Sequence, residues 1–287
     1  MNYNYNKLWK LLIDRKITKT EMRLQAGIST NMLAKMGKDE PVSMETLAKI
    51  ATYLECGIDD ICEFKATDLI MKILELNDLK KEAKVFCEFM KKENHPSLIG
   101  VTDGKAVGTY VEHRFQNYLN SKYILDVGSS AKGIDLPGDN IMTDIKVTSI
   151  TQPQSSCPFK NARQKIFGLG YNLLVFVYEK YDTADTCSLD FKYCAFIEKN
   201  RTADYTITKR LRQMVDDDAN KDDIIGFLVD RNVPGDEIVY NDLADEILAN
   251  KPHQGYLTIS NALQWRLQYS RVIALGNSVD GVLNYEW

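Results

Sequence analysis

The stretch of this chain best suited to chemistry is the acid-x-Lys triplet Asp144-Ile145-Lys146, which follows a lone aspartate, Asp135, by nine residues. Residues two apart in a β-strand point to the same face, so we expect Asp144 and Lys146 to project together. Ile145 would then point into a core. If Asp135 lies on the adjoining strand of a hairpin, two carboxylates meet, and a cation relieves their repulsion. Carboxylate oxygens suit Mg²⁺, so the pattern predicts metal-assisted phosphodiester cleavage.

The same pattern has a simpler explanation. Acid-x-Lys sequences occur by chance in exposed hairpins, where the two charges form a solvated pair of little energetic value. The elements around the triplet must therefore decide between a catalytic group and a surface ion pair.

A helix predicted over residues 106–119 supplies a third acid. Its apolar residues recur at helical spacing, and Glu112 lies at the edge of the apolar face. A carboxylate at such an edge is costly unless it has a partner, which makes Glu112 a candidate member of the acidic cluster. An ordinary surface glutamate fits the same position.

The segments on both sides of the triplet predict a mixed α/β module. A strand is expected before the hairpin and a short helix, which contains Gln164, after it. Two continuous apolar runs follow, as expected for strands that are buried on both faces. The ranges are 123–127 for the first strand, 160–168 for the helix, and 173–178 and 193–197 for the buried strands.

This order of elements resembles the core of the PD-(D/E)xK nuclease superfamily, best known from type II restriction endonucleases, over roughly residues 104–200. The residues that carry the resemblance are Glu112, Asp135, Asp144-Ile145-Lys146 and Gln164. The resemblance implies that Asp135 and Asp144 bind Mg²⁺ with help from Glu112. It further implies that Lys146 orients or activates the attacking water and that Gln164 is a supporting glutamine. The chain departs from the family pattern at Ile134, where proline is usual, and in having aspartate as the triplet acid.

Residues 7–64 have the pattern of five short helices. Thr18 and Ser29 are N-cap candidates, and Gly27 suits the turn after a helix. Through its Ala-Gly-Ile-Ser turn and its Ile-Asp-Asp-Ile ending, this stretch resembles phage-repressor-like (Cro/C1-type) helix-turn-helix domains. The resemblance implies that the helix from Ser29 to Lys38 enters the DNA major groove. Its candidate DNA contacts are Thr30, Asn31, Lys35 and Lys38. The alternative is that these helices only pack or dimerise.

Two further segments carry candidate DNA contacts. Residues 151–158 are rich in amides and hydroxyls, which contact base edges and phosphates, and two prolines indicate an irregular loop. In the tail, a short strand is expected over 237–239 and a helix over 260–269. The tail resembles a winged helix, in which the helix over 260–269 faces the groove; the alternative is that the tail helices pad the nuclease core or form a dimer interface. The candidates are Gln152, Gln154, Ser155 and Ser156 in the loop, and Asn261, Gln264, Arg266 and Gln268 in the tail.

Length and composition set the domain plan. The 287 residues suggest several modules: a helix-turn-helix domain (1–65), linker helices (66–100), the nuclease core (101–200) and a C-terminal region (201–287). No apolar run is long enough to span a membrane. Six scattered cysteines argue against zinc sites and disulfides and fit the reducing cytoplasm, and three histidines without metal-ligand spacing disfavour a zinc hydrolase. The net charge of −4 does not by itself support DNA binding.

Together these patterns predict an α/β nuclease core, a mixed sheet flanked by helices, with an all-α N-terminal helix-turn-helix domain and a mainly helical C-terminal region. The predicted function is a Mg²⁺-dependent, sequence-specific endonuclease of double-stranded DNA, of the type II restriction kind. A homodimer would match a palindromic target. The alternative is a helix-turn-helix transcription regulator whose nuclease-like domain is inactive or auxiliary, or a bifunctional restriction enzyme that also regulates its own expression.

Overall fold

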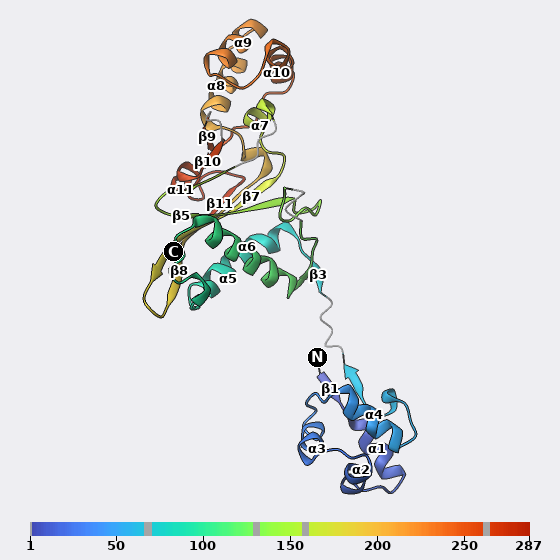
Figure 1. Cartoon of the computed structure of the whole chain (residues 1–287). Helices are drawn as coiled ribbons and strands as arrows, with labels where there is room; N and C mark the ends of the chain where they lie inside the picture. Colours follow the sequence, from blue (N-terminus) through green and yellow to red (C-terminus); the bar gives the residue numbers. More distant parts are fainter. Residues whose placement is uncertain (1, 66–70, 129–132, 157–160, 261–264) are drawn as a thin grey trace. The chain divides into compact units, whose positions relative to one another are not determined.

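The computed structural model describes residues 2–65, 71–128, 133–156, 161–260 and 265–287 (Figure 1). The chain divides into two compact units, Met1–Ile70 and Met71–Trp287. Each unit has a hydrophobic core of its own.

The first unit is a small helical domain. Its helices are α1 (Asn6–Asp14), α2 (Lys19–Gln25), α3 (Thr30–Met36), α4 (Met44–Tyr53) and the 3₁₀ turn η1 (Ile58–Asp60), which confirms the five short helices. Thr18 caps α2 by accepting a hydrogen bond from the Glu21 amide, and Ser29 caps α3 through the Met32 amide. Gly27, between the two helices, has a φ of +64°, a conformation that favours glycine.

The prediction of an all-α first unit was wrong in one respect. Strand β1 (Asn2–Asn4) pairs antiparallel with β2 (Glu63–Lys65) and so joins the two ends of the domain. Such a pairing links residues far apart in sequence, and three-residue strands leave no period for a local pattern to reveal.

The second unit is built on a four-stranded mixed sheet. Its order is β11 (Val282–Glu286), β8 (Cys187–Ile197), β7 (Asn172–Asp182) and β5 (Thr143–Ser149). Strands β5 and β7 run parallel, and the other two pairs are antiparallel. The predicted mixed sheet flanked by helices is therefore present.

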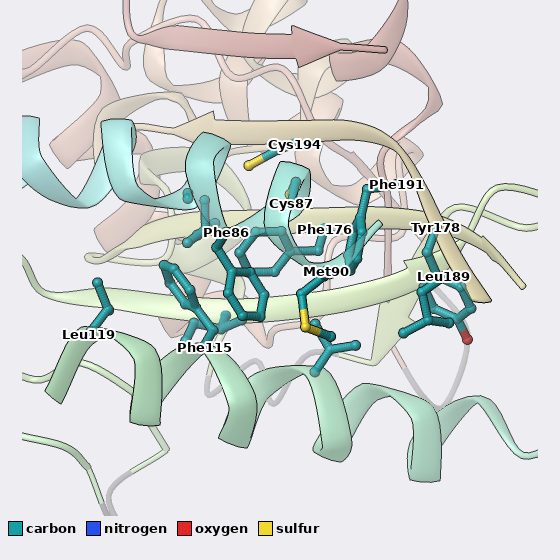
Figure 2. Packing of buried hydrophobic residues seen from close by; sticks show 14 of the residues in the cluster. Phe86, Cys87, Met90, Phe115, Leu119, Phe176, Tyr178, Leu189, Phe191 and Cys194 are labelled. Atoms are coloured by element: carbon teal, nitrogen blue, oxygen red, sulfur yellow. The ribbon is translucent and has the colours of Figure 1, made fainter. Parts of the chain in front are cut away.

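Helices α5 (Leu76–Met90) and α6 (Gly104–Asn120) cover one face of this sheet (Figure 1). Figure 2 shows Phe86 of α5 and Phe115 of α6 meeting Phe176 of the sheet. The Phe86 ring centroid lies 4.9 Å from that of Phe115 and 5.7 Å from that of Phe176. Helix α5 comes from the segment predicted as linker helices, so this segment also contributes to the main core.

Residues 173–178 of strand β7 are buried on both faces, as their apolar run predicts. Leu174 and Phe176 face α5 and α6, whereas Leu173 and Val175 belong to a second core on the opposite face. The second core includes residues of β9 (Thr258–Ile259), β10 (Arg266–Gln268) and α11 (Ser270–Leu275).

The remaining elements complete the second unit. Helices α8 (Tyr205–Asp216), α9 (Lys221–Asp230) and α10 (Glu237–Ala249) gather at the end away from α5 and α6 (Figure 1). The shorter elements are β3 (Lys72–Ile73), which runs parallel to β4 (Tyr123–Ile124), the 3₁₀ turns η2 (Pro96–Leu98) and η3 (Lys199–Arg201), β6 (Gln154–Ser156) and α7 (Ala162–Phe167).

Three local predictions for the loop and the tail were wrong. Residues 154–156 form strand β6 rather than irregular loop, and residues 266–268 form strand β10 rather than helix, because the two segments pair with each other across the sequence. Residues 237–239, predicted as a strand, begin helix α10 under an Asp236 cap. The winged-helix arrangement is not confirmed, and β11 instead joins the main sheet.

Two general expectations can be compared with the described residues. None of their helices is long and apolar enough to cross a membrane. Among the described cysteines, Cys56, Cys62, Cys87, Cys187 and Cys194 are free thiols.

Candidate active site

The acid-x-Lys triplet lies on β5, at the edge of the sheet. Asp144 and Lys146 share one face of the strand, and the Lys146 Nζ lies 2.6 Å from the Asp144 Oδ2. Ile145 faces the other way, into the core beneath α6. The expected two-residue alternation is confirmed, and it places the ion pair against the buried part of the sheet, where the Asp144 side chain is only 4% exposed.

Asp135 reaches this strand through a short antiparallel bridge. Leu136 and Thr143 exchange backbone hydrogen bonds of 3.0 and 2.9 Å, which closes the predicted hairpin. The Ile145 amide donates to the Asp135 Oδ2 at 2.7 Å, between Asp144 and Lys146 along the strand. The hairpin thus brings Asp135 to the triplet.

Glu112 approaches the same place from α6 and is half-buried. Burial, followed by the charge and hydrogen bond of Asp135, raises the pKa of Glu112 to about 7, and the nearby Lys146 charge opposes the rise. Glu112 is therefore close to both Asp135 and Lys146. The structure brings it into the cluster instead of leaving it as a solvated glutamate.

Asp144 is the most buried carboxylate of the cluster. Burial raises the pKa of Asp144 to about 7; the Lys146 charge opposes this rise, and a hydrogen bond to Asp135 adds to it. Three carboxylates thus meet through Asp135. At neutral pH such a group retains protons or takes up a cation, because like charges held together in a partly buried place repel each other.

The donors of this cluster fit a divalent cation such as Mg²⁺, which prefers carboxylate oxygens. Within the ranges described above, no three histidine, cysteine, aspartate or glutamate side chains are arranged to hold a metal ion. The acids instead meet in pairs, Glu112 with Asp135 and Asp135 with Asp144. The pair Asp135–Asp144 is the one that lies beside the lysine.

Comparison with known proteins identifies the second unit. Residues 73–284, most of the chain, match the family model for the type II restriction enzyme NspV. The chain belongs to the NspV family of type II restriction enzymes. A curated relative, the type II restriction enzyme NspV of Nostoc sp., is 54% identical over 215 residues, which is 74% of this chain and 97% of that protein.

The first unit matches a different group. Residues 7–67 fit the model for the Cro/C1-type helix-turn-helix DNA-binding domain, which confirms the resemblance. A solved structure, the transcriptional regulator VanUg in crystal form II, is 50% identical; the match covers 22% of this chain and 83% of that one, with a TM-score of 0.21. The Nostoc relative is matched over 97% of its length by 215 residues, so it has no room for a domain of this size.

This member of the NspV family contains a second acid-x-Lys pair on the same sheet. Asp190 and Lys192 on β8 also lie 2.6 Å apart, but the Asp190 side chain is 30% exposed and Lys192 also pairs with Glu179. The environment rather than the spacing separates the two pairs.

Gln164, the predicted supporting glutamine, lies on α7. Its side-chain amide donates to the Leu169 carbonyl at 3.4 Å, which ties it to the segment just after its own helix. Its assignment to the acidic cluster stays a prediction.

The predicted DNA contacts of the first unit lie on α3 and just after it. Thr30, Asn31 and Lys38 are exposed, and Lys35 is half-buried. Met36 on the same helix is fully buried and anchors α3 in the domain core. An exposed polar face over a buried apolar one is what a groove-binding helix requires.

The predicted contacts in the loop and tail come together on paired strands. Arg266 of β10 lies opposite Ser156 of β6, and Ser155 lies opposite Leu267. A groove of about 590 Å³ runs beside them, lined by Lys105, Thr148, Gln152, Gln154, Ser156 and Arg266 among others. Asn261 and Gln264 lie outside the described residues.

Thr148 was not among the sequence candidates, although it continues the spacing of Asp144 and Lys146 on one face of β5. Its Oγ1 lies 3.1 Å from the carbonyl oxygens of Gln152 and Gln154 and accepts a hydrogen bond from the Gln154 amide at 3.2 Å. Extending the two-residue alternation by one step would have drawn attention to it.

Proposed function

We propose that this chain is a Mg²⁺-dependent endonuclease that hydrolyses phosphodiester bonds of double-stranded DNA at specific sequences. The observation that carries the proposal is the buried ion pair of Asp144 and Lys146, 2.6 Å apart, beside Asp135 and Glu112. Membership of the NspV family supports the same reaction.

The roles of the side chains follow from their positions. Asp144 holds the Lys146 ammonium at the surface of β5, where 19% of the lysine side chain is exposed to solvent. From there Lys146 can hold a water molecule or a phosphate oxygen next to the carboxylates. The Ile145 amide keeps Asp135 in place, and Glu112 buttresses Asp135 from α6.

Asp135 and Asp144 would hold Mg²⁺, with Glu112 in support. When bound, the ion neutralises the clustered carboxylates and stabilises the negative charge that develops on the phosphate. An incoming phosphate would meet the Lys146 ammonium, which Asp144 holds in position.

Incubation of the full chain with mixed bacterial DNA, in Mg²⁺ and in chelator, tests the proposal. We expect discrete fragments with Mg²⁺ and intact DNA with chelator. Asp144→Asn should leave the DNA intact under both conditions while the protein keeps its circular dichroism spectrum. Metal-independent cutting, or full cutting by Asp144→Asn, would contradict the proposed site.

A symmetric dimer is the expected working form, because a palindromic target presents two equivalent strands related by a two-fold axis. Light scattering of the chain, alone and with target DNA, measures its mass. A dimer on DNA is the expected result, and a monomer that cuts both strands would contradict it.

A second function is favoured by the first unit. Its match to the Cro/C1-type domain and the exposed polar residues of α3 suit sequence-specific DNA binding that acts beside cleavage. Because the Nostoc relative has no room for this domain, we propose that the domain regulates expression, including that of the enzyme's own gene, and does not serve cleavage. Footprinting upstream of the gene tests this.

A further inference from the structure

The short sheet formed by β6, β10 and β9 presents a polar face beside the candidate active site. In β10, Leu267 is fully buried, while Arg266 and Gln268 on either side of it are exposed. Residues directly opposite each other in an antiparallel pair share a face, so Ser156 and Gln154 lie on the same outward side as Arg266 and Gln268.

Ser155 belongs to the opposite face. It lies across from Leu267, and its hydroxyl is 2.5 Å from that of Tyr269, which is fully buried. Ser155 therefore holds the ribbon to the core through Tyr269, although it is half-buried and also lines the groove. The outward face consists of two amides, a guanidinium and a hydroxyl.

This ribbon is joined to the catalytic strand through Thr148. The residue is buried, with 7% exposure, and its hydroxyl contacts both ends of the turn into β6 through Gln152 and Gln154. Thr148 follows Lys146 by two residues on β5, a separation of about 7 Å along the strand. The ribbon is therefore set at a defined distance from the lysine, and Thr148 lines the groove together with Gln154 and Arg266 of the ribbon.

The Nostoc relative locates sequence choice in the same unit. That protein is a type II restriction enzyme, yet 215 residues account for 97% of it and leave no room for a helix-turn-helix domain. The groups that choose the cleaved sequence in this family are thus expected in the second unit. The major groove of DNA admits a two-stranded β-ribbon, and glutamine and arginine are the side chains that pair with adenine and guanine edges there.

We propose that the ribbon of β6 and β10 enters the major groove and discriminates base pairs through Gln154, Arg266 and Gln268, and that Thr148 is the positioning residue that couples this contact to cleavage. The inference rests on the proposed nuclease function and assigns its specificity to these residues. Arg266 is matched to guanine and the two glutamines to adenine.

The first experiment uses the full chain and unmethylated bacterial genomic DNA, with sequencing of the fragment ends to obtain the cleaved consensus. Cleavage rates are then measured on the consensus duplex and on duplexes that each carry one substituted base pair. Arg266→Ala, Gln268→Ala and Gln154→Ala should each slow consensus cleavage by about 10- to 100-fold and lose discrimination at a different position. Unchanged discrimination in all three variants would overturn the proposal.

The matched control is another exposed arginine–glutamine pair, Arg210 and Gln213 on α8, which are joined by a hydrogen bond of 3.1 Å. Arg210→Ala and Gln213→Ala should cut with wild-type selectivity. If these control variants lost as much cleavage selectivity as the ribbon variants, the ribbon would not be the surface that selects the sequence.

Thr148 is tested by a pair of substitutions. Thr148→Val keeps the shape of the side chain but removes its hydroxyl. This variant should have a lower kcat on the consensus duplex and a smaller ratio between the cleavage rates of the consensus and substituted duplexes. Thr148→Ser restores the hydroxyl and should recover both. If Thr148→Val keeps wild-type kcat and selectivity, or if both variants lose only thermal stability, the coupling role is wrong.

Failure of the proposed nuclease function can be distinguished from failure of the proposed ribbon contact. If the wild-type chain cuts no DNA, ribbon contact is measured by selection from a pool of random duplexes in chelator, with Thr30→Ala and Asn31→Ala silencing the first unit. Selected duplexes whose binding depends on Arg266 support the ribbon alone. Absence of an Arg266-dependent consensus overturns it.

Discussion

Lys146 and Asp144 form a 2.6 Å ion pair on one face of β5, and the carboxylate of that pair is almost fully buried. Asp190 and Lys192 form a pair of the same length on β8, in which Asp190 is 30% exposed. The two pairs share residue types, spacing and distance. They differ in burial and in the neighbours Asp135 and Glu112, which only the first pair has.

This contrast defines the first prediction. Lys146→Ala should slow DNA cleavage by about 10²- to 10⁴-fold, the range expected when a group that handles a proton or positions water is removed. Lys192→Ala removes an ammonium from the less buried pair on β8, and this variant should cut DNA at the wild-type rate. Single-turnover cleavage of a plasmid measures both, and equal rates in the two variants would contradict the catalytic assignment of Lys146.

Glu112 supports the site from α6. Glu112→Gln should raise the Mg²⁺ concentration needed for half-maximal cleavage by about 10- to 100-fold, as expected when a group that holds a metal-binding carboxylate is altered. Glu88→Gln on α5, at an exposed position, is the control. If both variants needed the same Mg²⁺ concentration for half-maximal cleavage, Glu112 would have only a structural role.

The acidic cluster makes stability depend on pH. In the folded, metal-free chain the pKa values of Glu112 and Asp144 rise to about 7 from ordinary values of 4.5 and 3.8. The folded chain then binds more protons than the unfolded chain, so this cluster costs stability as pH rises from about 4 to about 7. Added Mg²⁺ should therefore raise Tm more at about pH 7.5 than at about pH 5.5.

The control for this pH effect removes both charges. The double variant Glu112→Gln, Asp144→Asn should show a Tm gain from Mg²⁺ that is small and independent of pH. Calorimetry of the two proteins at each pH gives the comparison. A gain in the wild type that shrinks with rising pH has the opposite sign and would rule out proton–metal competition at this cluster.

Substitutions in the first unit should impair binding to the upstream DNA, and substitutions in the second unit should impair cleavage. Asn31→Ala on α3 should weaken binding to the upstream DNA of the gene by about tenfold or more, the value of one good base contact. The same variant should cut at the wild-type rate, and Lys146→Ala should bind the upstream DNA normally. Electrophoretic shift and cleavage assays on both proteins provide the test; a cleavage defect in Asn31→Ala would show that the first unit serves cleavage.

The core between the helices and the sheet gives a stability prediction. Phe86 is fully buried among Phe115, Phe176 and Phe191, so Phe86→Ala should lower the free energy of unfolding of the second unit by about 3–5 kcal/mol. Phe89 on the same helix is 44% exposed, and Phe89→Ala should cost about 1 kcal/mol or less. Denaturant titration compares the two, and similar costs would mean that the α5 face is assigned wrongly.

Much of the site followed from local patterns. Two-residue alternation placed Asp144 and Lys146 on one face and Ile145 in the core, and helical spacing placed Glu112 at the edge of an apolar face. Capping chemistry at Thr18 and Ser29 marked the helix starts. These features depend on residues within a few positions of each other, which is the range over which backbone periodicity and N-caps act.

The errors share a different cause. Strand β10, predicted as a helix, and strand β6, predicted as a loop, exist because they pair with each other, although Ser156 and Arg266 are 110 positions apart in the sequence. Short strands have weak intrinsic preferences, and the partner decides their conformation. The same holds for β1 and β2 at the ends of the first unit.

The sequence on its own determined the resemblance of each unit to a known family and the residue types of the site. Composition and spacing are properties of the chain alone. The tertiary structure decided which acid-x-Lys pair is buried among carboxylates, since Asp144-Lys146 and Asp190-Lys192 have the same spacing. It also decided that the Ser155 hydroxyl contacts the buried Tyr269 while Arg266 is exposed. Burial, charge repulsion and strand register arise only when distant segments meet, so only the fold separates these groups.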